Sequence, residues 1–175
     1  MRKKYLKGET LKVISKEKLI KVLINGRYEC YVRKSPLYNP YTKSDIYDWS
    51  FKLETDDLTF TDAYRGFNPY SGVEYVYEKN GSIPIWSCDY VGYVNQDTNI
   101  PAEEIYKFLK EARGKHIMNC DDNLFSNYKY ENNKFKYETF FQGDIDALLQ
   151  KENFYYGDLL VAQQITAGRL KQFYE

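Results

Sequence analysis

The chain has 175 residues, a formal net charge of zero and 43% hydrophobic residues. This length can bury one continuous core but is too short for two ordinary domains joined by a linker, so we expect a single domain over residues 1–175. No apolar run approaches the roughly 18 to 20 residues of a membrane span, and the start, MRKKYLKGETLKV, lacks the apolar segment of a signal peptide. We therefore expect a cytoplasmic protein without membrane contact.

Charge is spread unevenly along the chain. Residues 1–34 carry 11 Lys/Arg and 3 Asp/Glu, whereas residues 35–175 carry 14 and 22. The two parts should therefore attract each other. Residues 1–14 are a candidate basic N-terminal extension that could grip phosphate, but the zero net charge of the whole chain makes nucleic acid an unlikely partner.

The first half of the sequence predicts one helix and two hairpins. Ser15 is a good N-cap for a helix over KEKLIKVLI, and Asn25-Gly26 is a typical stop. A short strand over 28–32 and a proline-punctuated loop should follow. The expected hairpin strands are 47–54 with 58–64, and 72–78 with 83–94, the second pair joined by Asn80-Gly81.

The second half predicts a stronger helix and further strands. Pro101 should open this helix and Gly114 should end it, with apolar residues at helical spacing between them. A hairpin over 125–131 and 134–141, a short helix over 145–150 and a last strand over 154–165 are expected. The fold class is therefore α+β: a mainly antiparallel sheet with two to three helices packed on it, without internal sequence repeats.

Motifs of the common enzyme classes are absent from this sequence. It contains no GxSxG elbow, P-loop, HExxH or GxGxxG motif. The three cysteines, Cys30, Cys88 and Cys120, form no CxxC pair, and His116, four residues before Cys120, adds only one more metal ligand. We expect no metal and no cofactor. A hydrolase that acts on small molecules or nucleotides through carboxylates and His116 is the alternative function.

The segment 62–92 is the best candidate for a binding site. Three glycines interrupt strand-like sequence there, and glycine inside strands marks bulges or close backbone approach. Aromatic side chains beside such a bulge could stack on a planar group, while Arg65 and Glu74 fix its polar edge. The alternative is a twisted hairpin whose aromatic side chains form core. The predicted site residues are Tyr64, Arg65, Tyr70, Glu74, Trp86 and Tyr90, with structural glycines Gly66, Gly72 and Gly92.

The same segment resembles a known family. GFNPYSGVEYVY followed by PIWSCDYVGYV is similar to the bacterial domain of unknown function family 5680, whose members show F-x-G-x-E and then P-x-W-x-M-N-Y-x-G. The FLKEA segment, the hairpin YKYENNKFKYE and TAGRLK continue the resemblance over residues 18–172. Departures are Tyr70 for phenylalanine, Cys88-Asp89 for Met-Asn, and Thr166-Ala167-Gly168 for a His-Gly-Gly.

The resemblance implies a sensing or docking module, because family members also occur appended to helix-turn-helix regulators. We expect a non-catalytic binding protein whose partner is either a small nucleotide-like ligand, which it senses or sequesters, or a protein that it inhibits. A tyrosine-rich chain, with 19 Tyr, suits both tasks. A phage-encoded factor against host defence is a hypothesis based on size, composition and the missing regulator domain. Tyrosines at strand edges could also support a homodimer.

Overall fold

Helix α1 runs from Lys16 to Arg27 in the computed structural model, which describes residues 14–171. The predicted cap is confirmed, because Ser15 Oγ accepts a hydrogen bond from the Lys18 backbone N–H at 3.2 Å. The stop at Asn25-Gly26 is wrong. The helix continues into a π-helical turn, η1 (Tyr28–Val32), where a strand was expected.

Gly26 serves packing rather than helix termination. A Cβ on Gly26 would lie 2.3 Å from a ring carbon of Phe60, so the helix axis can approach the sheet only because this position has no side chain. The glycine therefore sits in the helix interior, with the chain helical on both sides of it.

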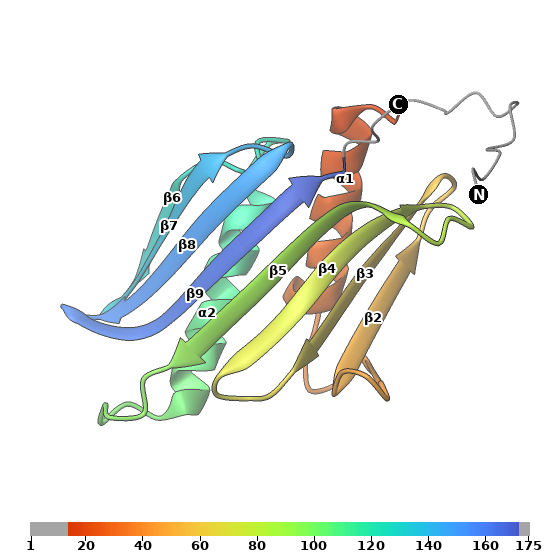
Figure 1. Ribbon diagram of the computed structural model, residues 1–175. Helices are drawn as coiled ribbons and strands as arrows, with labels where there is room; N and C mark the ends of the chain where they lie inside the picture. The colour runs from red at the N-terminus through yellow and green to blue at the C-terminus, as the bar shows by residue number, and fades with distance from the viewer. Residues whose placement is uncertain (1–13, 172–175) are drawn as a thin grey trace, which may run out of the picture.

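Helix α2 spans Ala102–Met118 and runs opposite to α1 (Figure 1). Pro101 is the N-cap of this helix and not its first residue, so the helix begins one residue later than predicted. The stop predicted at Gly114 is also wrong, because the helix passes through it. A Cβ added there would lie at ordinary contact distance, 3.4 Å, from Val32 of η1. Neither described helix is long and apolar enough to cross a membrane.

The first four long strands form the predicted antiparallel meander. The turn between the last two of these strands has Lys79 and Asn80 at its centre, one residue before the predicted Asn80-Gly81, and Asn80 has φ 65°. Each strand pairs with the next along the chain. The elements are β1 (Thr42–Lys43), β2 (Trp49–Glu54), β3 (Leu58–Arg65), β4 (Tyr70–Glu78) and β5 (Pro84–Val94).

The second meander differs from its prediction at the C-terminal end. The hairpin of β6 and β7 is confirmed, but the helix expected over 145–150 is a strand, in which Leu148, Gln150 and Glu152 alternate inward. The single last strand is in fact two, separated by a turn at Gly157, where φ is 57°. The elements are β6 (Tyr128–Asn132), β7 (Phe135–Gly143), β8 (Ala147–Tyr156) and β9 (Leu159–Leu170).

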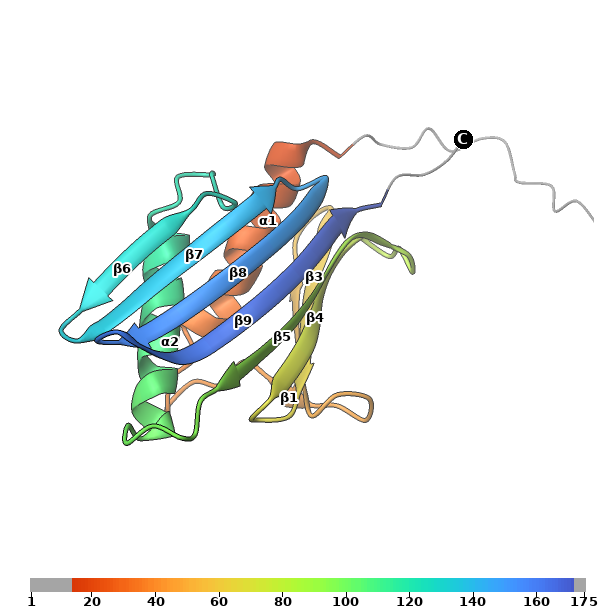
Figure 2. The same ribbon diagram turned by 60° about the vertical axis from the view of Figure 1, so that its left-hand side comes forward.

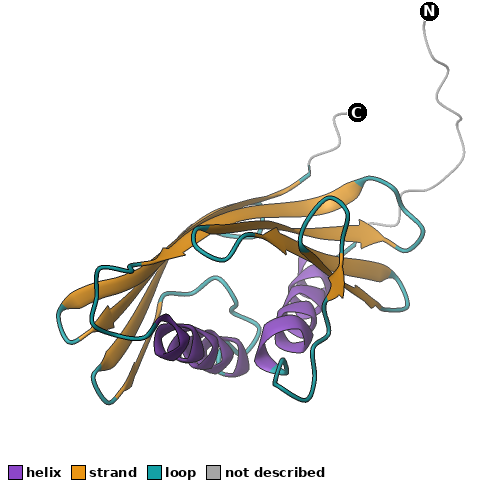
Figure 3. Ribbon diagram, turned by 90° about the horizontal axis from the view of Figure 1, so that it is seen from below, coloured by secondary structure: helices purple, strands orange, loops and turns teal. Residues whose placement is uncertain are grey.

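All nine described strands join one antiparallel sheet in the order β1-β2-β3-β4-β5-β9-β8-β7-β6. The sheet twists strongly along its width (Figure 2), and both helices lie against the same, concave face (Figure 3). The expected α+β class with an antiparallel sheet is confirmed, with α1 and α2 as its helices in the part of the chain described. Of the basic extension expected over 1–14, residues 1–13 lie outside the described residues.

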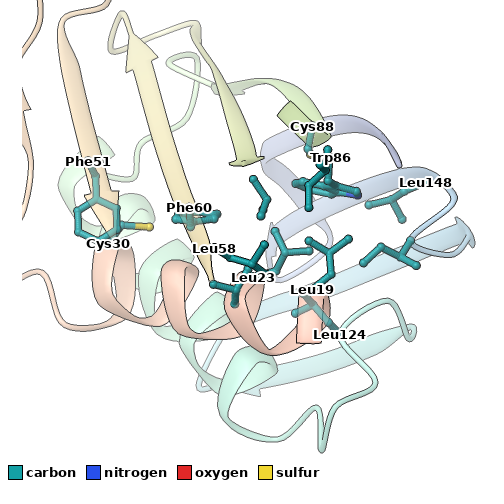
Figure 4. Packing of buried hydrophobic residues seen from close by; sticks show 14 of the residues in the cluster. Leu19, Leu23, Cys30, Phe51, Leu58, Phe60, Trp86, Cys88, Leu124 and Leu148 are labelled. Carbon is teal, nitrogen blue, oxygen red and sulfur yellow. The ribbon is translucent and has the colours of Figure 1, made fainter. Parts of the chain in front are cut away.

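Two apolar clusters fill the space between helices and sheet, one for each helix. The first gathers buried side chains of α1 around Phe60 and Trp86 (Figure 4). The second gathers α2 around Tyr137 and Phe154. Polar side chains separate the two clusters, so the centre of the concave face is not filled by apolar core.

The two halves repeat one unit, a helix followed by a meander of four strands, and the first half adds the two-residue strand β1. β5 and β9 pair antiparallel at the sheet centre, with Tyr90 opposite Thr166. A twofold rotation about this pair exchanges β5 with β9 and each further strand of one meander with its counterpart in the other. This rotation places Glu74 on Glu152. Glu74 lies two residues after the β4 residue that pairs with Tyr90, and Glu152 lies two residues after the β8 residue that pairs with Thr166.

The helices obey the same relation. The 12 residues of α1 and the 5 of η1 together match the 17 of α2. Aligning their first residues places Leu19 on Ile105 and Leu23 on Leu109, all of which are buried. The same alignment places Arg27 on Arg113. The fold is therefore approximately twofold symmetric about the centre of its concave face.

The two helical glycines give a matched test of this packing. Gly26→Ala should lower the free energy of unfolding by about 1 to 3 kcal/mol, because the new methyl group overlaps the Phe60 ring. Gly114→Ala should instead raise it by up to about 1 kcal/mol, because its Cβ has room and alanine favours helix. Urea denaturation of both variants measures this, and equal effects would contradict the assigned packing.

Candidate functional site

A cavity of about 440 Å³ opens between the two helices and the concave face of the sheet. It lies at the twofold centre, since its walls include equivalent residues from both halves, such as Arg27 with Arg113 and Glu74 with Glu152. The sequence placed the site in one hairpin, whereas the structure builds it from both repeats.

The structure brings four of the six predicted site residues to this cavity. Tyr64, Tyr70, Glu74 and Tyr90 line it, and so does Gly66. Gly66 has φ 76°, which favours glycine, and its N–H donates to Asp48 at 2.7 Å.

The other two predicted residues lie elsewhere. Trp86 is completely buried in the core around α1, where its indole N–H has no hydrogen-bond partner among the described residues. Arg65 is exposed at the end of β3 and borders a shallow depression that also contains Val91 and Ile165. These positions make Trp86 a packing residue and place Arg65 outside the cavity.

Two predicted glycines shape the aromatic wall of the cavity. Tyr70 lies opposite Gly92, and Gly72 lies opposite Tyr90, on the paired strands β4 and β5. A Cβ on Gly92 would lie 2.4 Å from the Tyr70 ring, and one on Gly72 would lie 2.3 Å from the Tyr90 hydroxyl. Each tyrosine therefore lies across the backbone of the facing strand. Any side chain in place of the facing glycine would overlap the tyrosine.

A buried ion pair joins the first helix to the sheet beside the cavity. Arg27 donates to Glu74 from Nε, at 3.1 and 3.2 Å, and from Nη2, at 2.7 Å. The Tyr31 hydroxyl donates to the same carboxylate at 3.0 Å. Both charged side chains are almost fully buried, so these bonds compensate for the water that each has lost.

A second buried carboxyl, Asp62, lies across the strand pair from Glu74. It accepts hydrogen bonds from the Tyr41 hydroxyl at 2.5 Å and the Tyr90 hydroxyl at 2.9 Å. Burial, followed by the neighbouring Glu74 charge, raises the pKa of Asp62 to about 7, against the opposing effects of the two tyrosine hydrogen bonds and Arg27. The proton of Asp62 is therefore exchangeable near neutral pH.

The second repeat carries an equivalent ion pair. Arg113 donates to Glu152 from Nε at 3.1 Å and from Nη2 at 2.8 Å, and Tyr137 donates to the same carboxylate at 2.8 Å. Arg113 also donates to the Tyr70 hydroxyl at 3.2 Å and to the Gln164 side chain at 2.8 Å. This network joins α2 to strands of both halves.

The mouth of the cavity carries aromatic and basic side chains. Phe67, which is 66% exposed, packs against Tyr106 with ring centroids 4.8 Å apart. The Tyr106 hydroxyl donates to the Phe67 carbonyl at 2.5 Å, which fixes this lip to α2. Lys34 and Lys110 also line the cavity, and burial together with the neighbouring Lys110 lowers the pKa of Lys34.

The only histidine of the chain, His116, is a buried residue that lines the cavity. Burial lowers its pKa to about 4, so the ring is neutral at physiological pH. It stacks on Tyr128, and its Nε2 has no hydrogen-bond partner among the described residues. Within residues 14–171, no group of three His, Cys, Asp or Glu side chains is arranged to hold a metal ion.

Sequence reasoning missed Asp62 and both arginines, although each leaves a signal. Asp62 continues the alternation of Leu58 and Phe60, which places a carboxyl on the buried face of its strand. Arg27 follows Leu19 and Leu23 at steps of four on the buried face of its helix, and Arg113 does the same in α2. A charged residue in line with buried apolar positions was the clue.

The pH dependence of stability tests the environment of Asp62. The native state holds this proton up to a pH near 7, whereas the unfolded chain releases it near the ordinary value of 3.8. The native state therefore binds more protons in this window, and the free energy of unfolding falls as the pH rises through it. In this window the Asp62 proton should lower the free energy of unfolding of the wild type by up to about 1.4 kcal/mol per pH unit, and Asp62→Asn should abolish this contribution.

Urea denaturation of both proteins between about pH 4 and pH 8 measures the effect. The stability of the wild type should decrease relative to that of the variant until the pH reaches the native pKa, and the difference should then stay constant. Parallel pH profiles would show that Asp62 titrates normally.

Comparison with known proteins gives one match. No curated protein matches the chain. No solved structure matches it either. Residues 62–170 match the family described as a domain of unknown function, DUF5680. The matched part runs from β3 to the end of β9 and includes Asp62, Glu74 and Glu152 of the cavity. Because this match covers more than half of the sequence, the chain belongs to the DUF5680 family.

Proposed function

We propose that the protein binds a small planar ligand in the central cavity and releases it unchanged, as a sensing or sequestering domain. The observation that carries this proposal is the cavity itself. Its volume of about 440 Å³ lies within the range of small-molecule sites, and its walls combine tyrosine rings with a few fixed polar groups.

Preorganisation supports a binding role. The carboxylates of Glu74 and Glu152 are each held by an arginine and a tyrosine, so a ligand would meet polar groups that are already oriented. Because these side chains are already ordered, binding of a ligand loses little conformational entropy. A nucleotide-like ligand suits these walls, because a flat ring can stack on tyrosine and bond to the polar groups at its edge.

A small ligand suits this geometry better than an inhibitory contact with another protein. Tyr70, Glu74 and Tyr90 face an inward cavity, and Tyr90 is hydrogen-bonded to a buried carboxyl. A protein partner would need exposed anchor side chains, as at most interfaces. Among the cavity residues, Phe67 at the lip is the large apolar side chain that is mainly exposed.

Native mass spectrometry of the protein purified from bacterial cells should detect a small mass that disappears on denaturation. Tyr64→Ala should weaken ligand binding by up to about tenfold, and so lower its occupancy, because stacking on an aromatic ring contributes about 0.5 to 1.5 kcal/mol. Tyr75→Ala is the control, since Tyr75 lies on the opposite face of the sheet and packs on Tyr77. Occupancy that is equal in both variants would place the ligand elsewhere.

Hydrolysis of a nucleotide-like substrate is a second candidate, favoured by one observation. Asp62 lines the cavity with a pKa of about 7, which suits proton transfer near neutral pH. The neutral His116 lines the same cavity.

This candidate predicts that a nucleotide panel followed by mass spectrometry will yield product. Asp62→Asn should abolish turnover, and the rate of the wild type should rise with pH through about 7 if Asp62 acts as a base. Recovery of every nucleotide unchanged would reject hydrolysis of these substrates and leave the binding proposal standing.

A further inference from the structure

The carboxylates and the ammonium groups of the cavity differ in how well they are paired. Glu74 and Glu152 each accept bonds from an arginine and a tyrosine, and Asp62 accepts bonds from two tyrosines. The negative groups therefore need no positive group from a ligand. An additional cation would find these oxygens already occupied.

Among the residues described, Lys34 and Lys110 have no carboxylate as a direct partner, although the Asp62 charge acts on Lys34 from a distance. Neither forms an ion pair with an acidic side chain among residues 14–171. The Lys34 ammonium lies 5.1 Å from the Tyr41 ring centroid and 3.4 Å from the Tyr64 hydroxyl, so aromatic side chains hold it at the cavity. Two like charges that line one cavity repel each other unless an anion lies between them.

The arginines add donors of the same kind. Arg27 and Arg113 use Nε and Nη2 to bind their glutamates, and the Nη1 group of each has no partner within the described chain. Both arginines line the cavity. The free hydrogen-bonding capacity of its charged groups therefore consists of positively charged donors, which recognise phosphate or carboxylate.

We propose that the ligand of this cavity is an aromatic anion, whose ring lies against the tyrosines and whose phosphate or carboxylate lies between Lys34 and Lys110. This inference rests on the proposed binding function and specifies the chemistry of the ligand. The aromatic wall made by Tyr64, Tyr70 and Tyr106 lies in the same cavity as the two lysines, so one molecule can contact both.

Two fluorescent probes test the proposal because they differ only by one anionic group. 1-Anilinonaphthalene-8-sulfonate is an aromatic anion, and N-phenyl-1-naphthylamine has the same ring system without the sulfonate. The wild type should bind the sulfonate about tenfold more tightly, the amount expected from one or two charge-assisted hydrogen bonds. The double variant Lys34→Gln/Lys110→Gln should lose this preference while binding the neutral probe as before.

Lys107→Gln is the matched control, because Lys107 is exposed on α2 but does not line the cavity. It should retain the wild-type preference. Tyr64→Ala should weaken both probes, which would locate them in the cavity. Displacement of the sulfonate by AMP but not adenosine would assign a phosphate ligand, and displacement by indole-3-acetate but not 3-methylindole would assign a carboxylate.

The outcomes separate the two proposals. Equal affinity for the two probes, or a preference that survives in the double variant, would overturn the anion assignment while the cavity remained a binding site. If neither probe bound, both this assignment and the proposed binding function would be contradicted.

Discussion

The buried ion pair of Arg27 and Glu74 is the interaction on which the architecture of the cavity depends. Burying either charge alone would be costly, and removing one partner of such a pair typically costs about 3 to 5 kcal/mol. The pair persists because its members bond to each other and to Tyr31. The equivalent pair of Arg113 and Glu152 ties the second helix to the sheet. The two pairs fix both helices beside the twofold centre, where their side chains line an open cavity.

The glycine pattern of β4 and β5 follows from the same need to keep the centre open. Tyr70 and Tyr90 lie flat over Gly92 and Gly72, so their rings extend along the sheet instead of standing upright into the cavity. The Tyr90 hydroxyl thereby reaches Asp62, and that of Tyr70 reaches Arg113 of the other half. An alanine at either glycine would displace a ring and break a bond to a buried charged group. The two glycines are therefore required by packing at the site, although glycines at this spacing in the sequence are also compatible with an ordinary twisted hairpin.

Local turn chemistry explains what the sequence predicts well, and long-range packing explains what it does not. The hairpins are found because Asn80 and Asn133 adopt the positive φ that their turns require. Both helix ends are placed too early because the chain stays helical through Gly26 and Gly114. Gly26 is required by its contact with Phe60, which is distant in sequence, whereas Gly114 has room for a side chain. The repeat escapes sequence inspection because its halves share burial and register rather than residue identity. Half of the cavity comes from the second repeat, so no single segment could indicate it.

Some differences between the two repeats lie at the cavity. The position of Asp62 is occupied by Thr139 in the second half, and that of Tyr90 by Thr166. The first repeat therefore presents a carboxyl beneath tyrosine rings, whereas the second presents hydroxyl and amide groups, with Gln150 donating to Thr139 at 3.1 Å. The shared ion pairs maintain one scaffold, and these substitutions give its two sides different chemistry. A molecule that spans the twofold centre would meet Asp62 and Tyr90 on one side and Gln150 and Thr166 on the other, with equivalent arginine–glutamate pairs on both sides. The site therefore favours a ligand whose own two ends differ.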